Sequence, residues 1–193
     1  MKVAITGTIG SGKSTLMTII KDMGYQTLSC DEIAHALQEP NQPGYLAITT
    51  NFKNILNEKG KIDRFKLGNI VFNDKSELKK LNTLMFPLIK TELISEMAHA
   101  SLIFVEVPLL FEAHFEDLFD YSILVVADEN LIHERLNKRG LNTEAIVSRL
   151  TNQMNVEDKK ILADYIIENN HNLEEMKKQL KVILKEVDLN ACM

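Results

Sequence analysis

The sequence predicts an α/β protein built on a doubly wound, parallel sheet of five strands, and three observations support this fold class. Short apolar segments rich in Val, Ile, Leu and Phe alternate with longer segments in which apolar residues recur three and four positions apart. The short segments carry almost no polar residues, which is typical of parallel strands covered by helices on both faces. A glycine-rich loop directly follows the first short segment, at the edge where such sheets bind their ligands.

The individual elements follow from this alternation in chain order. The predicted strands comprise residues 2–6, 26–30, 101–107, 121–127 and 165–168. The predicted helices comprise residues 14–23, 32–37, 77–81, 89–99, 131–138, 143–152, 157–162 and 173–187. Ser76, Asn142 and Asn172 each precede one of these helices, and we expect their side chains to cap it.

The chain is predicted to form one domain in which two helical segments are set on the sheet. The core of this domain is expected at about residues 1–31, 100–130 and 155–193. Residues 32–99 contain no strong strand and are too many for a simple crossover, so they predict a helical subdomain, with turns at 40–44 and 57–60. A second helical pair, at about residues 131–154, lies between the fourth and fifth strands and carries Arg135, Arg139 and Arg149.

Composition narrows the class of protein. The 193 residues are 45% hydrophobic and 25% charged, which is typical of a soluble domain with a sizeable core. A net charge of -5 argues against a protein that coats nucleic acid. Cys30 and Cys192 form no metal-binding spacing, and no signal peptide or membrane span is evident, so we expect a reduced, cytoplasmic protein with no membrane partner. We expect a monomer or a small homo-oligomer.

The glycine-rich loop predicts a phosphate-binding site. Residues 7–14 read GTIGSGKS and match the spacing G-x-x-x-x-G-K-[ST] between an apolar strand and a helix. Its glycines let the backbone aim N–H groups at an anion, which the N-terminus of the following helix also favours. We expect Lys13 to reach the β- and γ-phosphates and the Ser14 hydroxyl to coordinate Mg²⁺. The loop residues assigned to ATP binding are Gly7, Gly10, Ser11, Gly12, Lys13, Ser14 and Thr15.

A phosphate loop indicates a nucleotide but not a reaction, and several classes remain open. A GTPase switch would need an Asn-Lys-x-Asp guanine reader, whereas residues 137–140 read NKRG, with Gly140 in place of the aspartate. An ATP-driven motor would need a strand ending in Asp-Glu, whereas the third strand ends in Glu106 and runs into Val107-Pro108. A nucleoside or nucleotide monophosphate kinase would share the sheet, the loop and an arginine lid. A regulatory module that hydrolyses ATP slowly is the alternative from another class.

A small-molecule kinase also needs a carboxylate for the acceptor hydroxyl and cations over the transferring phosphoryl group. Asp31 follows the second predicted strand and is placed to supply the carboxylate, although it could also simply cap the helix that begins at Glu32. Arg135, Arg139 and Arg149 could close over the phosphates from a mobile lid or could line a solvated helix face.

Several further segments, in order along the chain, resemble the dephospho-coenzyme A kinase family. Besides the phosphate loop, they read CDEIAHAL (30–37), PGYLAI (43–48), KIDRFKLGNIVFND (61–74), FPLI (86–89), VEVPLLFE (105–112), RLNKR (135–139), RLTNQ (149–153) and ADYIIEN (163–169). The resemblance implies a nucleoside monophosphate kinase-like fold with a helical acceptor-binding subdomain and a small lid. It also implies phosphorylation of the ribose 3′-hydroxyl of dephospho-coenzyme A by ATP and Mg²⁺, which gives coenzyme A and ADP in the last step of coenzyme A biosynthesis.

The resemblance also assigns roles to single residues. Asp31 would act as the base, with Lys13 and Arg139 as the other catalytic residues. Arg135 and Arg149 would support ATP from the lid. Acceptor binding would fall to Asp31, Asp63, Arg64, Pro108, Leu109 and Leu110.

The sequence departs from the family pattern at three places. Ser29-Cys30-Asp31 stands where the family usually has Asp-Ala-Asp, so the second carboxylate is kept and the first becomes a hydroxyl. Phe86 replaces a common His, and Glu106 replaces a common Asp.

Overall fold

A computed structural model describes residues 1–191 of the protein, so Cys192 lies outside the described residues. The chain divides into two compact units, one formed by Met1–Leu28 with the residues from His99 onward, and the other by Ser29–Ala98. Among residues 1–191, no helix is both long enough and apolar enough to span a membrane.

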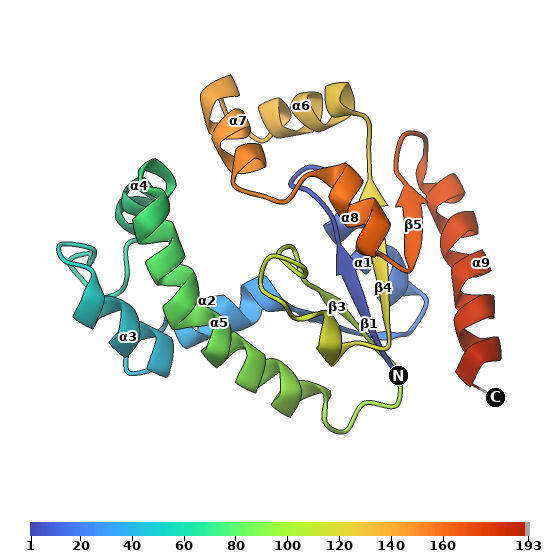
Figure 1. The fold of residues 1–193 in the computed structure, drawn as a ribbon, viewed down its shortest axis with the longest axis horizontal. Coiled ribbons are helices and arrows are strands. Elements are labelled where there is room, and N and C mark those ends of the chain that lie inside the picture. The colour runs from blue at the N-terminus through green and yellow to red at the C-terminus, as the bar shows by residue number, and fades with distance from the viewer. Residues whose placement is uncertain (192–193) are drawn as a thin grey trace. The chain divides into compact units, whose positions relative to one another are not determined.

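The first unit is built on a five-stranded sheet. Its strands are β1 (Lys2–Thr6), β2 (Gln26–Ser29), β3 (Ile103–Glu106), β4 (Tyr121–Val126) and β5 (Tyr165–Glu168), in the order β2-β3-β1-β4-β5. β1 pairs in parallel with β3 and β4, and β4 pairs in parallel with β5 (Figure 1). The predicted parallel sheet is therefore confirmed, and each strand begins and ends within two residues of its predicted bounds.

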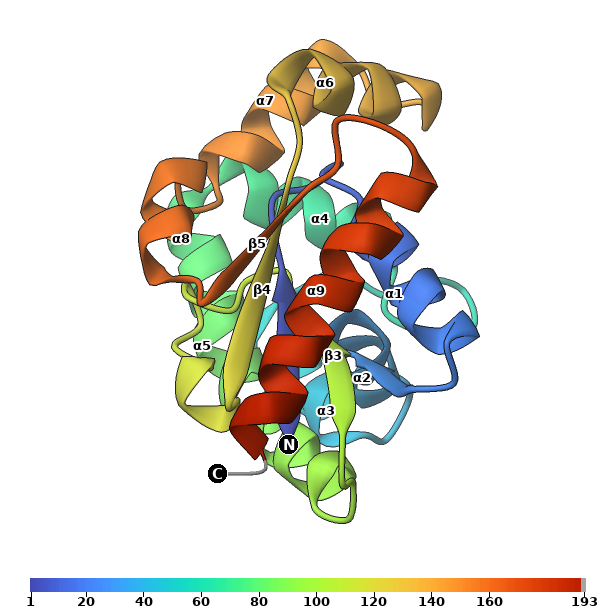
Figure 2. The same cartoon turned by 90° about the vertical axis from the view of Figure 1, so that its right-hand side faces the viewer.

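One face of the sheet packs against α1 (Lys13–Asp22) and α9 (Leu173–Ala191), and Figure 2 shows α9 lying across the strands. Leu16 of α1, Leu180 of α9 and Ile5 of β1 belong to one buried cluster. Asn172 caps α9 as expected, because its Oδ1 accepts a hydrogen bond of 3.0 Å from the N–H of Glu175. Alternate strand residues point to the other face, where Val105 is also fully buried. Burial on both faces explains why the strands read as continuous apolar runs.

Three further helices of this unit lie between β4 and β5. They are α6 (Glu129–Lys138), α7 (Thr143–Thr151) and α8 (Val156–Leu162). Ile132 and Leu136 of α6 form a small buried cluster with Ile146 of α7. Ile9 of the phosphate loop packs against this cluster, so α6 and α7 contact the loop through apolar side chains.

The second unit is helical. It contains α2 (Cys30–Leu37), α3 (Pro43–Asn51), α4 (Arg64–Asn73) and α5 (Lys75–Met97), and α5 packs against the other three. The predicted turn at 57–60 is confirmed by a hydrogen bond of 3.0 Å from the N–H of Gly60 to the carbonyl of Asn57. The predicted turn at 40–44 is wrong in its second half, because α3 begins at Pro43. Proline suits the first position of a helix, where its fixed φ is already helical and no N–H is needed.

The prediction of separate helices at 77–81 and 89–99 is wrong, because α5 runs unbroken through Pro87. A proline inside a helix costs about 3 kcal/mol or more through a lost hydrogen bond and a clash. Met85, Ile89 and Leu93 are buried four residues apart on one side of α5. Packing of this apolar face against the neighbouring helices offsets the cost of the proline.

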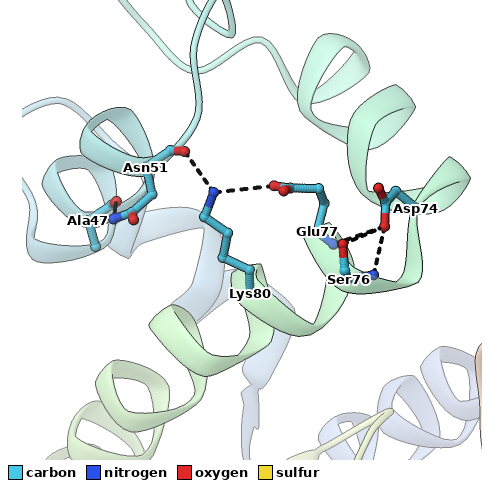
Figure 3. A network of polar contacts seen from close by, with 6 residues as sticks. All are labelled: Ala47, Asn51, Asp74, Ser76, Glu77 and Lys80. Carbon is cyan, nitrogen blue, oxygen red and sulfur yellow. Dashed lines mark hydrogen bonds and ion pairs between the residues drawn. The ribbon is translucent and has the colours of Figure 1, made fainter.

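The predicted cap at Ser76 is also wrong, because Asp74 caps α5. Asp74 Oδ1 accepts hydrogen bonds from the N–H of Ser76 at 2.8 Å, the Ser76 hydroxyl at 2.7 Å and the N–H of Glu77 at 3.4 Å. Figure 3 shows these residues at the start of α5. The Ser76 hydroxyl and then these backbone donors lower the pKa of Asp74 below its usual value. An aspartate is a strong helix cap, and here the serine two residues later serves it as a donor.

Candidate active site

The phosphate loop has the backbone geometry that its glycines predict. Gly7, Gly10 and Gly12 have φ angles of 147°, 82° and 107°, a region that side chains with a Cβ atom rarely adopt. A Cβ at Gly7 would collide with the carbonyl oxygen of Val125, and one at Gly12 would collide with Nδ2 of Asn169. The loop is therefore wound tightly against the ends of β4 and β5.

Lys13 lies across the inside of the loop. Its Nζ donates hydrogen bonds of 2.9 Å to the carbonyl oxygens of both Gly7 and Thr8, and its side chain is buried. These two hydrogen bonds hold the ammonium group inside the loop. Ser11 is also fully buried, and its hydroxyl has no hydrogen-bond partner among residues 1–191, so it can donate to a ligand.

Ser14 and Glu106 form an oxygen-rich pair beside the loop. The Ser14 hydroxyl donates a hydrogen bond of 3.2 Å to Glu106 Oε1, so the longer carboxylate at position 106 reaches the first turn of α1. A hydroxyl and a carboxylate are ligands that suit Mg²⁺, which usually keeps several waters and binds substrate phosphates. The donor set of this pair therefore fits a magnesium ion.

Arg135 and Asn169 hold the loop from the outside. Asn169 Nδ2 donates to the carbonyl of Ser11 at 2.7 Å, and the guanidinium of Arg135 donates to the carbonyls of Gly10 and Ser11 at 3.5 and 3.4 Å. Arg135 Nη2 also donates to the carbonyl of Asn169 at 2.8 Å. Sequence reasoning assigned Arg135 to ATP and gave Asn169 no role.

The segment after α7 is tied to the loop and to the turn after β3. The N–H of Ile9 donates to Gln153 Oε1 at 3.0 Å, and the N–H of Met154 donates to Glu112 Oε1 at 2.8 Å. Glu112 also pairs with Lys159 Nζ at 2.8 Å, and the Lys159 side chain is completely buried. These contacts had a sequence signal, because Gln153 and Glu112 end two of the family blocks, but residue type and spacing alone gave them no function.

The two other predicted lid arginines lie on the same helical pair as Arg135. Arg139 is the exposed C-cap residue of α6, and Arg149 lies half-buried in the last turn of α7. The structure brings Arg135 to the phosphate loop.

Asp31 occupies the first turn of α2 and does not cap this helix. The cap is Ser29, whose Oγ accepts a hydrogen bond of 3.4 Å from the N–H of Glu32. The helix begins at Cys30, so the interpretation of Asp31 as a helix cap is wrong and its exposed carboxylate remains available for chemistry. Ser29, which departs from the family pattern, therefore has a structural role.

The predicted acceptor residues Asp63 and Arg64 begin α4. Asp63 Oδ1 caps this helix by accepting from the N–H groups of Phe65 and Lys66 at 3.0 and 3.2 Å. Arg64 is exposed. A hydrogen bond from Lys61, and the charges of Lys61 and Arg64, lower the pKa of Glu39. Asp63 therefore serves as the cap of α4, whereas the charged side chain of Arg64 is exposed to solvent.

The turn after β3 holds the other predicted acceptor residues. Pro108 and Leu109 keep part of their surface exposed, whereas Leu110 is completely buried. The carbonyl of Pro108 accepts a hydrogen bond of 3.3 Å from Lys159 Nζ. Phe86 lies half-buried on α5.

Comparison with known proteins identifies the family. The dephospho-CoA kinase family profile matches residues 1–175. A protein of Lactobacillus johnsonii named dephospho-CoA kinase is 38% identical over 192 residues, which cover 96% of this chain and 97% of the relative. A dephospho-CoA kinase of Helicobacter pylori is 38% identical over 191 residues, or 95% of each chain.

Solved structures agree with this identification. A dephospho-CoA kinase from Campylobacter jejuni superposes with a TM-score of 0.70 at 31% identity, over 99% of this chain and all of the other. A protein from Thermus thermophilus superposes with a TM-score of 0.83 at 33% identity, over 96% of this chain and 97% of the other. A shikimate kinase from Acinetobacter baumannii, at 17% identity and a TM-score of 0.58, shares the fold. A phosphate loop with its lysine in place, together with a family match over most of the sequence, shows that this chain belongs to the dephospho-CoA kinase family.

Proposed function

We propose that this protein transfers the γ-phosphoryl group of ATP to the ribose 3′-hydroxyl of dephospho-coenzyme A, which gives coenzyme A and ADP. The observation that carries the proposal is the loop geometry, in which the Lys13 ammonium already lies inside a wound phosphate loop. Family membership over residues 1–175 supports the choice of acceptor.

The loop is proposed to bind the phosphates of ATP through backbone N–H groups, the Ser11 hydroxyl and the Lys13 ammonium. Thr15 follows in the first turn of α1, where the helix dipole favours negative charge. Ser14 is the proposed protein ligand of Mg²⁺, and Glu106, whose Oε1 lies 3.2 Å from the Ser14 hydroxyl, would accept hydrogen bonds from water on the metal. When bound, the metal would neutralise charge on the β- and γ-phosphates.

Asp31 is proposed to accept the proton of the 3′-hydroxyl as the hydroxyl oxygen forms its bond to the γ-phosphorus. The bond between that phosphorus and the bridging oxygen breaks, and ADP leaves with the electron pair. No phosphoenzyme is formed. The Asp31 carboxylate is exposed and does not cap α2, which supports this role.

The helical pair at about residues 131–154 is proposed to act as a lid. Arg139 would stabilise the charge on the transferring phosphoryl group, and Arg135 and Arg149 would support ATP. Closure would exclude water, which otherwise competes with the ribose as acceptor.

Acceptor binding is proposed for the helical segment at about residues 32–99, with Arg64 as the exposed cation. Pro108 and Leu109 suit a contact with the acceptor better than Leu110, because Leu110 has no exposed surface. We further propose a cytoplasmic protein that acts as a monomer or small homo-oligomer and binds no nucleic acid.

Product analysis of a paired set of variants tests the proposal. Phosphorus NMR of the wild-type reaction should show one new monoester at the ribose 3′ position. Asp31→Asn should lose most turnover, whereas Glu32→Gln, an exposed carboxylate one residue along the same helix, should keep it. A product phosphorylated elsewhere would refute the reaction, and equal turnover of both variants would remove Asp31 from the chemistry.

A further inference from the structure

Asn169 and Arg135 contact the backbone of the phosphate loop on its outer side. Asn169 donates to the Ser11 carbonyl at 2.7 Å, and Arg135 donates to the Gly10 and Ser11 carbonyls at 3.5 and 3.4 Å. The 2.8 Å bond from Arg135 to the Asn169 carbonyl joins the two side chains into one unit.

These contacts determine the direction of the neighbouring N–H groups. The C=O and N–H of one trans peptide unit point in opposite directions. A carbonyl of Ser11 held toward Asn169 therefore turns the N–H of Gly12 to the opposite side of the peptide. Glycines at positions 10 and 12 adopt either sign of φ readily, so their peptides could otherwise rotate and present carbonyl oxygens to an anion. The outer contacts remove this freedom.

Asn169 is itself firmly placed. It is 8% exposed, and its N–H donates to the carbonyl of Val126 at 2.8 Å, which continues the pairing of β4 and β5 by one residue. Its amide approaches the loop so closely that a Cβ at Gly12 would collide with it. A glycine is therefore needed at position 12 both for the close contact with Asn169 and for the turn of the loop.

From these contacts we infer that Asn169 and Arg135 are positioning residues for the phosphates of ATP. They act through the backbone of the loop, which they keep in its anion-binding conformation. The Arg135 guanidinium also brings a positive charge to the loop, within 3.5 Å of the Gly10 carbonyl. The inference rests on the proposed function and specifies how Arg135 serves the ATP site.

The inference is tested by the binding of inorganic pyrophosphate and of ADP, each with Mg²⁺, measured by titration calorimetry. Asn169→Ala should weaken both ligands by the same factor, about three- to tenfold for one lost hydrogen bond to the loop. Asn170→Ala is the matched control, because this neighbouring side chain bonds Asp128 and not the loop. It should change neither affinity by more than about twofold. Pyrophosphate lacks a nucleoside, so it reports on the loop alone.

Arg135→Lys is the second variant, since it keeps the charge on α6 but replaces the planar guanidinium, whose two terminal nitrogens contact three carbonyl groups, with a single ammonium nitrogen. It should weaken pyrophosphate and ADP equally and raise the KM for ATP more than it lowers kcat. Thermal unfolding of each variant checks that it is folded. Weaker binding of ADP with unchanged pyrophosphate binding would mean direct contact with the nucleoside and would overturn the inference, as would unchanged binding of both. Because pyrophosphate binding needs no acceptor, this result is independent of whether the chain phosphorylates dephospho-coenzyme A.

Discussion

Replacing Glu112 with Gln should destabilise the protein strongly, because Glu112 is the counter-ion of a buried lysine. The Lys159 side chain has no exposed surface, and its Nζ lies 2.8 Å from Glu112 Oε1. Glutamine keeps an oxygen that can accept from the N–H of Met154, so the substitution removes charge and leaves that hydrogen bond. Removing one partner of a buried ion pair typically costs about 3–5 kcal/mol, because a buried charge is left uncompensated.

Urea unfolding at constant pH measures the loss as a fall in the free energy of unfolding at unchanged m-value. The double variant Glu112→Gln/Lys159→Met should recover most of it, since no unpaired charge then remains buried. The control is Glu174→Gln, which breaks the exposed pair with Lys177 and should cost less than about 1 kcal/mol. A loss below about 1 kcal/mol for Glu112→Gln, or a double variant as unstable as the single one, would refute the reasoning.

Three further outcomes are expected. Arg139→Ala should lower kcat strongly and leave the midpoint of thermal unfolding nearly unchanged, because the residue is exposed and ends its helix. A large fall in the unfolding midpoint as well would make Arg139 a structural residue. Gly12→Ala should weaken ADP binding at least about tenfold in calorimetry, since its φ of 107° and the collision with Asn169 both force the loop to move, and wild-type affinity would contradict the loop geometry. Asp74→Ala should lower the unfolding temperature of the protein above about pH 5, where Asp74 is charged in both the folded and unfolded states. Because the folded pKa of Asp74 lies below the unfolded value of about 3.9, the difference from wild type should shrink as pH falls through that lower pKa, and a difference that grows in acid would contradict the cap.

The sequence predicted the sheet and the phosphate loop because both depend on local pattern. Strands buried on both faces must be apolar along their length, and the loop requires glycines at fixed positions. The unbroken helix through Pro87 could not be predicted, because local propensity ends a helix there and only packing of the face carrying Met85 and Ile89 keeps it intact. The cap of α2 could not be assigned for a similar reason, since Ser29 and Asp31 are both good caps and the exact start of the helix decides between them.

Residue type and spacing alone could not predict the contacts that Asn169 and Gln153 make with the phosphate loop, although each residue ends a segment that resembles the family. Asn169 is 158 residues from Ser11, and Gln153 is 144 residues from Ile9, so the strand order rather than any spacing brings each pair together. An asparagine at the end of a strand and a glutamine after a helix are common surface residues. Their roles follow from the hydrogen bonds that they make with backbone carbonyl and N–H groups of the loop.

ADP release from Mg-ATP, measured with dephospho-coenzyme A, with AMP and with no acceptor, tests the central claim most directly. We predict rapid release with dephospho-coenzyme A and only background release in the other two reactions. Release driven by AMP would indicate a nucleotide monophosphate kinase, and equal release in all three would indicate slow hydrolysis by a regulatory module. Either result would contradict the proposed function.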